Sequence, residues 1–456
     1  MKQYLLLTTL FFVCYVAHAQ KLTQTIRGKV IDAESQTPLI GANVYIVDSD
    51  PLLGAATDVD GNFRIEKVPV GRHNIRITYL GYEDGYISEL LVGSGKEIVL
   101  TIKLTEAITL TEAVTITAEP EKGEALNDMA VVSARMFTVE ETKRYAASIN
   151  DPARMAMNFA GVAANSDLQN DIVIRGNSPR GLLWRIEGIE VPNPNHFAST
   201  GSSGGGISIL SANMLANSDF FTGAFPAEYG NALSGVFDIK LRNGNNEQRE
   251  YALQAGLLGV DFAFEGPFSK NYNGSYLVNY RYSTLAIFDV LGIDVVGDAV
   301  PNFQDLSFKF KLPTKKFGSF SIWGLGGKSS QAETTNDYKY DYRSDMGATG
   351  VSHTFFLNKK TFIESVVSFS ASRGSYIEDQ FDDPSLPQLV YQDHLVNRSF
   401  RVSSMLNRKF NAKNTLRAGI IFSNLSFNLF SEGEDAGEIK RYIDNQGASQ
   451  LYQSYA

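Results

Sequence analysis

The second half of the chain contains segments in which apolar and polar residues alternate one by one. The clearest segments are residues 258–265, 275–283, 306–312 and 363–372. Successive side chains of a β-strand point to opposite faces, so this pattern produces a sheet with one apolar and one polar face. Phe308 and Phe310 would lie on one face, and Lys309 and Lys311 on the other. The alternation therefore predicts antiparallel strands throughout residues 246–456.

The connections between these segments alternate in length. Short polar turns are predicted at 269–271, 313–316, 358–360 and 411–414, and long polar loops at 292–302, 331–345, 378–388 and 432–447. Short turns on one side and long loops on the other are typical of an outer-membrane β-barrel, and the turns imply about eight strands with the beginning of a ninth. A soluble sandwich is the alternative, although its packed inner face would not accommodate repeated Lys, Arg and Glu.

The N-terminus has the pattern of a signal peptide. Lys2 supplies a positive charge, residues 4–16 are mostly apolar, and Ala17-His18-Ala19 offers a cleavage site, which predicts a signal peptide at 1–19. The only cysteine, Cys14, lies inside it, so neither disulfides nor thiolate metal sites are expected in the mature chain. No later apolar run reaches the roughly 18 residues of a membrane-spanning helix. An exported chain of this kind can enter a membrane only as a closed β-barrel.

Residues 20–104 form a separate zone of short alternating segments with turn signals between them, which predicts a β-sandwich. The stretches GKVIDAESQTPLIGANVYI, TDVDGNFRIEKVPVG and ITYLGY resemble the carboxypeptidase-regulatory-like domain, a transthyretin-type sandwich. The chain contains no His-x-x-Glu pair, so a zinc peptidase site is not expected.

Residues 105–245 mix helix and strand signals. Residues 105–135 read as an extended β-branched run followed by a charged linker. Thr138 and Glu141 form a capping-box pattern, and Asp151, Pro152 and Gly161 frame a second short helix. Strands and glycine-rich loops follow.

Two stretches of this zone resemble the plug domain of TonB-dependent outer-membrane receptors of the Bacteroidetes type. They are IVIRGNSPRGLLWRIEGIEV and ISILSANMLANSDFFTGAFPAEYGNALSGVFDIKLRNG, and the matching positions are Arg175, Gly176, Gly223, Tyr229, Gly230 and Gly235. Glu187-Gly188 departs from the Asp-Gly that the family usually has. The resemblance implies a mainly β fold with an N-terminal β-sandwich, a mixed α/β plug domain at 136–245 and a partial transmembrane antiparallel β-barrel at 246–456.

The segment TLTEAVTITA is similar to the stretch where this family places or flanks its TonB box. It comprises Thr109, Leu110, Thr111, Glu112, Ala113, Val114, Thr115, Ile116, Thr117 and Ala118. An energising partner can grip an exposed β-branched segment by adding it as a strand to its own sheet. The alternative is that this segment simply extends the last strand of the sandwich.

The resemblance implies gated, energised uptake of an unknown small ligand across the outer membrane. TonB and the outer-membrane lipid would be the partners, and the sandwich would lie in the periplasm. A plug strand facing a polar barrel wall also suggests a latch, in which Arg175 would pair with an acidic residue such as Asp261, Glu265 or Glu364. The net charge of −9 argues against nucleic-acid binding.

The sequence offers no convincing enzyme signature, cofactor or metal site. Gly201-Ser202-Ser203-Gly204-Gly205 matches the nucleophile elbow of hydrolases, but turn-rich residues precede it and a β-like run follows, whereas the elbow needs a strand before it and a helix after it. The same glycines lack the Lys-Ser/Thr of a phosphate loop. His196 is isolated, and we expect a surface residue or a contact with the barrel lumen rather than a metal ligand.

The chain is expected to be a fragment or a truncated reading frame. A barrel of about 22 strands would need about 500 residues, and only residues 250–456 are available for strands. The ending LYQSYA also lacks the family's terminal aromatic. Two alternatives to a receptor remain: a small self-contained outer-membrane barrel with a structural or adhesive role, and a soluble extracellular glycan-binding protein.

Overall fold

The computed structural model describes residues 22–47, 49–107, 125–130, 132–144, 148, 151–166, 169–256, 259–284, 301–381 and 387–456. The predicted signal peptide at 1–19 and the box candidate at 109–118 lie outside these residues. The chain divides into two compact units, Met1–Lys122 and Gly123–Ala456. No helix in the described ranges has the length and apolar character needed to cross a membrane.

The first unit contains two β-sheets around one apolar core. Its strands are β1 (Thr23–Asp32), β2 (Asn43–Ile46), β3 (Gly54–Ala56), β4 (Asn62–Pro69), β5 (Gly71–Thr78), β6 (Gly85–Val92) and β7 (Ile98–Leu104). The sheet orders are β4-β1-β7 and β3-β2-β5-β6. Val44, Phe63 and Ile75 belong to the shared buried cluster. Each sheet buries one face, as the alternation predicted, and the sandwich is confirmed.

We use "plug" for residues 136–245. Its elements are β8 (Ala134–Phe137), α2 (Val139–Arg144), α3 (Pro152–Ala156), β9 (Val162–Ala164), β10 (Ile172–Ile174), η2 (Pro179–Gly181), β11 (Leu182–Ile186), β12 (Ile189–Glu190), β13 (Asn195–His196), β14 (Ile207–Ser208), β15 (Ser218–Phe221) and β16 (Gly235–Ile239). Five strands form one mixed sheet in the order β12-β11-β16-β15-β8. Its core is aromatic: the rings of Trp184 and Phe220 each lie 4.5 Å from that of Phe237.

The two plug helices begin where the sequence signals predicted. Thr138 and Glu141 form a reciprocal capping box, with Glu141 N to Thr138 Oγ1 at 3.1 Å and Thr138 N to Glu141 Oε2 at 2.9 Å. Asp151 caps α3 by accepting from the amide of Ala153. However, α3 ends at Ala156 and does not continue to Gly161. Its last residues turn early because the chain must enter β9, which pairs with β10.

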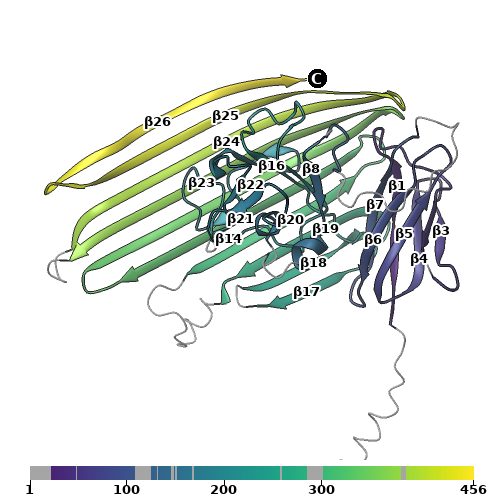
Figure 1. Ribbon diagram of the computed structural model, residues 1–456, viewed down its shortest axis with the longest axis horizontal. Helices are drawn as coiled ribbons and strands as arrows, with labels where there is room; N and C mark the ends of the chain where they lie inside the picture. The colour runs from purple at the N-terminus through teal and green to yellow at the C-terminus, as the bar shows by residue number, and fades with distance from the viewer. Residues whose placement is uncertain are drawn as a thin grey trace, which may run out of the picture. The chain divides into compact units, whose positions relative to one another are not determined.

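Ten antiparallel strands form one large sheet. They are β17 (Glu250–Ala255), β18 (Val260–Ser269), β19 (Tyr272–Tyr282), β20 (Asn302–Pro313), β21 (Ser319–Thr334), β22 (Tyr338–Asn358), β23 (Thr361–Phe381), β24 (Pro387–Asn411), β25 (Asn414–Asp435) and β26 (Glu438–Tyr455). They lie side by side in sequence order, with plug elements such as β8 and β16 against one face (Figure 1). The sheet has two more strands than the short turns implied, because β17 and β26 flank the outermost turns.

The short turns were predicted correctly, but two of the long loops were not. The stretch 331–345 is almost entirely strand, since β21 runs to Thr334 and β22 starts at Tyr338. The stretch 432–447 holds the end of β25, the turn residues Ala436 and Gly437, and the start of β26. Both were taken as loops because their residues are polar. Backbone pairing with a neighbouring strand does not require apolar side chains, so polar sequences can extend a strand beyond its apolar portion. The predicted loop at 292–302 lies mostly outside the described residues.

The plug identifies the inner face of the sheet. Lys309 of β20, Arg401 of β24 and Arg417 of β25 all contact plug residues. Side chains one position away point to the opposite, outer face. Phe400 and Ile420 are among these outer residues and are 42% and 64% exposed. An inner face with charged and buried apolar residues against the plug and an exposed apolar outer face are compatible with a membrane-spanning β-sheet, although the sheet order does not join β17 to β26 in the described residues.

We predict that Phe308→Arg, on the outer face at the middle of β20, destabilises the protein in lipid. A cation on the lipid face of such strands costs about 2–4 kcal/mol at the bilayer midplane and about 0–1 kcal/mol near the interfaces, so we expect a loss between these limits. Phe317→Arg is the matched control, because Phe317 is 69% exposed in the turn after β20. Urea unfolding in phospholipid vesicles measures both. Equal losses in the two variants would show that the outer face of β20 does not lie in lipid.

Candidate functional site

The plug contacts the inner face of the sheet through charged pairs. Four of them join the two parts: Glu187–Lys309 at 2.8 Å, Glu190–Arg401 at 3.3 Å, Glu228–Arg417 at 3.1 Å and Arg242–Glu265 at 2.6 Å. His196 adds a polar contact with Asp305 at 3.0 Å. Desolvation offsets much of the attraction within a buried ion pair, but removal of one partner leaves a costly unpaired charge. Such pairs therefore fix where the plug sits more than they stabilise the fold.

The linker that precedes the plug is held by both plug and sheet. The amides of Leu126 and Asn127 donate to the carboxylate of Asp219 at 2.7 and 2.8 Å. The Asn127 side chain donates to Glu228 at 2.8 Å, and its carbonyl oxygen accepts from Arg417 of β25 at 2.6 Å. We call Asn127, Asp219, Glu228 and Arg417 the linker clamp. It joins the linker, the plug and the barrel wall in one hydrogen-bonded group.

Electrostatics keep the clamp charged at Glu228. Burial alone would raise the pKa of Glu228, but the guanidinium groups of Arg185 and Arg417 hold it at about 2. Arg185 lies 2.8 Å from Glu228 and also stacks over the ring of Tyr229, 4.7 Å from its centre. Asp219 behaves differently: burial raises its pKa to about 6, although the two linker amides favour the carboxylate.

Tyr229 is the predicted plug residue closest to the clamp. Its hydroxyl donates to Asp238 at 2.8 Å and accepts from Asn127 at 3.0 Å. Gly230 follows it and lies close to the wall: a Cβ there would lie 2.7 Å from the side-chain amide nitrogen of Gln453 of β26, which would have to move. Sequence reasoning found Tyr229 through the family motif but missed Asn127, Asp219, Glu228 and Arg417. They carry no local pattern that predicts their contact.

The other predicted motif residues lie at turns and close approaches. Gly176 and Gly188 have φ of +79° and +85°, and Gly223 has +155°, values that favour glycine. A Cβ at Gly235 would lie 2.3 Å from Ile174, so two strands approach closely there. Glu187, which departs from the family pattern, uses its longer side chain to accept from the Leu241 amide at 2.7 Å and to reach Lys309.

The latch prediction gave Arg175 the wrong partners. Within the described residues, Arg175 donates to Ser133 and Thr222 at 2.8 and 3.3 Å and makes no ion pair with an acid of the sheet. Arg175 lies in a turn with a φ of 50°. Its side chain lies beside Gly161 and Gly223, which belong to the plug itself. Glu265 is already paired with Arg242.

Asp261 likewise has plug partners, because it accepts from Ser211 at 3.0 Å and Asn213 at 3.2 Å. Latching between plug and sheet thus exists, but other residues provide it.

His196 is a contact with the sheet rather than a surface residue. It is fully buried, and its Nε2 lies 3.0 Å from Asp305 of β20, which also pairs with Arg281 of β19. Burial lowers the pKa of His196 despite the nearby carboxylate. Among the described residues no group of three or more His, Cys, Asp or Glu side chains is placed to hold a metal ion.

A cavity of about 380 Å³ lies between the plug and strands β22 to β25. The plug side consists of residues 190–193, 195 and 198–202, and the sheet side includes Ser370, Ser372, Asn397 and Phe427. The glycine-rich segment predicted as a plug loop thus connects β13 with β14 and borders this cavity. It does not join a strand to a helix as a nucleophile elbow would. Hydroxyl, amide and aromatic groups line the cavity together with charged residues, among them Glu190 and Arg401, which suits binding of a small polar molecule.

We predict that acid weakens the linker clamp through Glu228. The pKa of Glu228 is about 2 in the folded protein against an ordinary 4.5. Its ion pairs therefore stabilise the clamp fully above about pH 4.5, and this contribution, on the order of 3 kcal/mol, is lost as pH falls towards 2. Hydrogen exchange of residues 125–130, corrected for intrinsic rates, measures the loss. Glu228→Gln should lower the protection at neutral pH and abolish this acid transition.

The variant Asp219→Asn tests the second carboxyl of the clamp separately from Glu228. The pKa of Asp219 is raised, so its ionisation removes stability as pH rises from about 4 to about 6. The variant should lose that transition and keep the one due to Glu228. A transition near pH 2–4.5 that survives in Glu228→Gln would contradict the assignment.

Comparison with known proteins finds similarity to one domain family and to one curated transporter. Residues 26–116 match the CarboxypepD_reg-like domain, so the match extends into the box candidate as far as Ile116. The TonB-dependent transporter Oar of Myxococcus xanthus is 25% identical over 240 residues, which cover 51% of this chain and 22% of that protein. The chain thus spans about a fifth of the length of this curated relative.

Solved structures of outer-membrane proteins are similar at lower identity. The outer membrane transporter YddB from Escherichia coli is 13% identical with a TM-score of 0.47, over 71% of this chain and 53% of that chain. The siderophore receptor PirA from Pseudomonas aeruginosa is 14% identical with a TM-score of 0.37, over 71% and 59%. The chain therefore combines a CarboxypepD_reg-like domain with similarity to a TonB-dependent transporter over half of its length.

Proposed function

We propose that the chain is the plug-bearing portion of a TonB-dependent outer-membrane receptor that takes up a small ligand with energy supplied by TonB. The observation that carries this proposal is the linker clamp. The linker leaves the box candidate at Ala118 and reaches the clamp at Asn127, only nine residues later. A pull on residues 109–118 would therefore act first on Asn127, and through it on Glu228 of the plug and Arg417 of the sheet.

In this mechanism the clamp couples two distinct sites. Ligand in the cavity between plug and β22–β25 would contact the plug on one side of the molecule, and the linker would respond on another. Coupling of this kind requires that the ligand binds two plug arrangements with different affinity. Buried ion pairs suit such a switch because desolvation offsets most of their attraction. When the plug rearranges and water enters, the separated charges are hydrated again, so breaking the pairs costs little.

The same proposal places the protein in the outer membrane with its sandwich in the periplasm, and assigns it no catalytic activity. The outer apolar face of the ten strands would contact lipid. A small self-contained barrel is disfavoured because the plug already occupies the inner face, where such a barrel would pack its own side chains. A soluble glycan-binding protein is disfavoured by the exposed outer aromatic and aliphatic side chains.

We predict that Val114→Pro abolishes binding of the TonB C-terminal domain. Proline cannot donate to a β-ladder, so strand addition would fail at the centre of the box candidate. Lys122→Pro lies in the same linker outside the candidate and should bind normally. Calorimetry with purified TonB domain compares the two. Unchanged binding by Val114→Pro would favour the alternative that these residues only extend the sandwich.

A second prediction concerns the cavity. Ser372→Trp should fill it, because Ser372 lines it from the inner face of β23. Ala371→Trp, one residue earlier, points to the outer face and serves as control. Uptake measured in cells that express the complete receptor should fall at least tenfold for Ser372→Trp, since loss of about 1.4 kcal/mol of binding has that effect. TonB binding should stay unchanged. Normal uptake by Ser372→Trp would exclude this cavity as the ligand site.

A further inference from the structure

The outer face of the sheet changes from apolar to polar within two residues along the strands. One row of paired positions is apolar throughout: Ile322, Val351, Val367, Val402, Phe422 and Tyr452. In the next outer row Phe369 and Phe400 are the large apolar residues, 48% and 42% exposed. Beyond them the apolar side chains largely stop. The Phe369 and Phe400 pair therefore marks the edge of the apolar band, about 7 Å beyond the fully apolar row.

Cations follow directly beyond this edge. Arg398 lies two positions beyond Phe400 on β24, on the same face. The next row contains Lys328, Asp345 and Arg373 as neighbours on β21, β22 and β23. Asp345 pairs with Arg373, whereas Arg398 and Lys328 make no hydrogen bond or ion pair within the described part of the chain. Two exposed cations thus stand unneutralised at the border of the apolar band.

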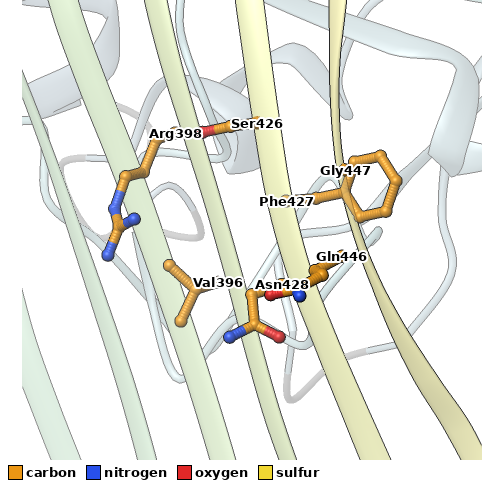
Figure 2. Close-up of a pocket in the computed structure, with 7 residues that line it drawn as sticks. All are labelled: Val396, Arg398, Ser426, Phe427, Asn428, Gln446 and Gly447. Atoms are coloured by element: carbon orange, nitrogen blue, oxygen red, sulfur yellow. The ribbon is translucent and has the colours of Figure 1, made fainter.

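A hollow of about 320 Å³ adjoins Arg398 (Figure 2). Val396 and Arg398 of β24, Ser426, Phe427 and Asn428 of β25, and Gln446 and Gly447 of β26 line it. The register puts Arg398 opposite Ser426 and Asn428 opposite Gln446, so all four side chains share the outer face. The side chains of Ser426, Asn428 and Gln446 make no hydrogen bond to other described residues. One guanidinium and three neutral polar groups therefore face outward with no protein partner.

We propose that this hollow binds the phosphate of a membrane lipid headgroup. Arg398 would pair with the phosphate, and Ser426, Asn428 and Gln446 would hydrogen-bond its remaining oxygens or the headgroup hydroxyls. The lipid chain would run along Phe400 and Phe369 towards the apolar row. Lys328 lies three strands away on β21, about 14 Å from β24, so salt largely screens its effect on this hollow. A free anion would gain the charge contact but not the apolar one.

Arg398, Ser426 and Phe427 border both this hollow and the ligand cavity, but by the alternation of the strands the side chains of Arg398 and Ser426 lie on the outer face, opposite to the inner-face residues Asn397 and Ser399. The lipid site rests on the proposed membrane location alone. The need for detergent during extraction shows which of the two hypotheses, membrane location or lipid site, has failed. A chain that is soluble without detergent would overturn both the location and the lipid site. A detergent-requiring chain without phosphate preference would overturn only the lipid site.

The test measures lipid binding to the full chain in neutral detergent by native mass spectrometry. The probes are short-chain phosphatidic acid, the matching diacylglycerol and inorganic phosphate. We expect preferential binding of phosphatidic acid, weakened about fivefold by Arg398→Ala, since one basic residue near a lipid surface contributes about 1 kcal/mol. Arg398→Lys keeps the charge and should lose less than about twofold.

Two further variants separate a local site from general charge. Lys328→Ala combined with Arg398→Ala should weaken binding little more than the roughly fivefold expected for Arg398→Ala alone, because Lys328 lies three strands away. Lys440→Ala is the control, because Lys440 is exposed at the far end of the β25–β26 hairpin and pairs with Asp435. It should bind like the unaltered chain.

Equal weakening by Lys440→Ala would show non-specific attraction and overturn the site. Inorganic phosphate that binds as tightly as phosphatidic acid, with the same dependence on Arg398, would show a free-anion site instead and also overturn the lipid assignment.

Discussion

The alternation of side chains across the ten-stranded sheet is the constraint on which the rest of the structure depends. A strand residue faces either the plug or the outside, and neighbouring residues take opposite sides. Lys309 can therefore reach Glu187 of the plug while Phe308 and Phe310 face outward on the same strand. The inner face carries charged residues that pair with the plug, and also apolar residues such as Trp323 and Leu325 that share one buried cluster with plug residues such as Trp184. Because the outer face is apolar, the same strands suit a bilayer.

Ion pairs at the inner face determine where the plug sits, but they do not hold it there irreversibly. Glu228 sits between Arg185 of the plug and Arg417 of the sheet, and these cations keep it ionised well below its ordinary range. A pair of this kind is specific in geometry but gains little net stability from burial. Asn127 adds the linker to the same group. The proposed mechanism centres on this contact because it joins the plug both to the sheet and to the linker.

Much of the fold is readable from local pattern, and particular residues show where this ends. The capping box of Thr138 and Glu141 and the four short turns follow from residues adjacent in sequence, and the structure has them where predicted. The long loops failed at 331–345 and 432–447 because polar residues there are held in strands by backbone pairing with neighbours. The Arg175 latch failed for a related reason. The sequence identified a cation in a glycine-rich turn, but its partners, Ser133 and Thr222, are set by how β8 and β15 pair.

The sequence by itself determined that the chain is mainly β, that its strands have two unlike faces, and that a sandwich precedes a plug-like segment. The β class, the two faces and the sandwich follow from side-chain period and turn chemistry, which act over a few residues, whereas the plug-like segment was inferred from its resemblance to a family. The tertiary structure decided which charges meet. Asn127 and Arg417 are 290 positions apart, and His196 and Asp305 are 109 apart. Nothing local selects such partners, because an ion pair depends on the position of two side chains in space. Only the register of ten strands and the seating of the plug bring them together.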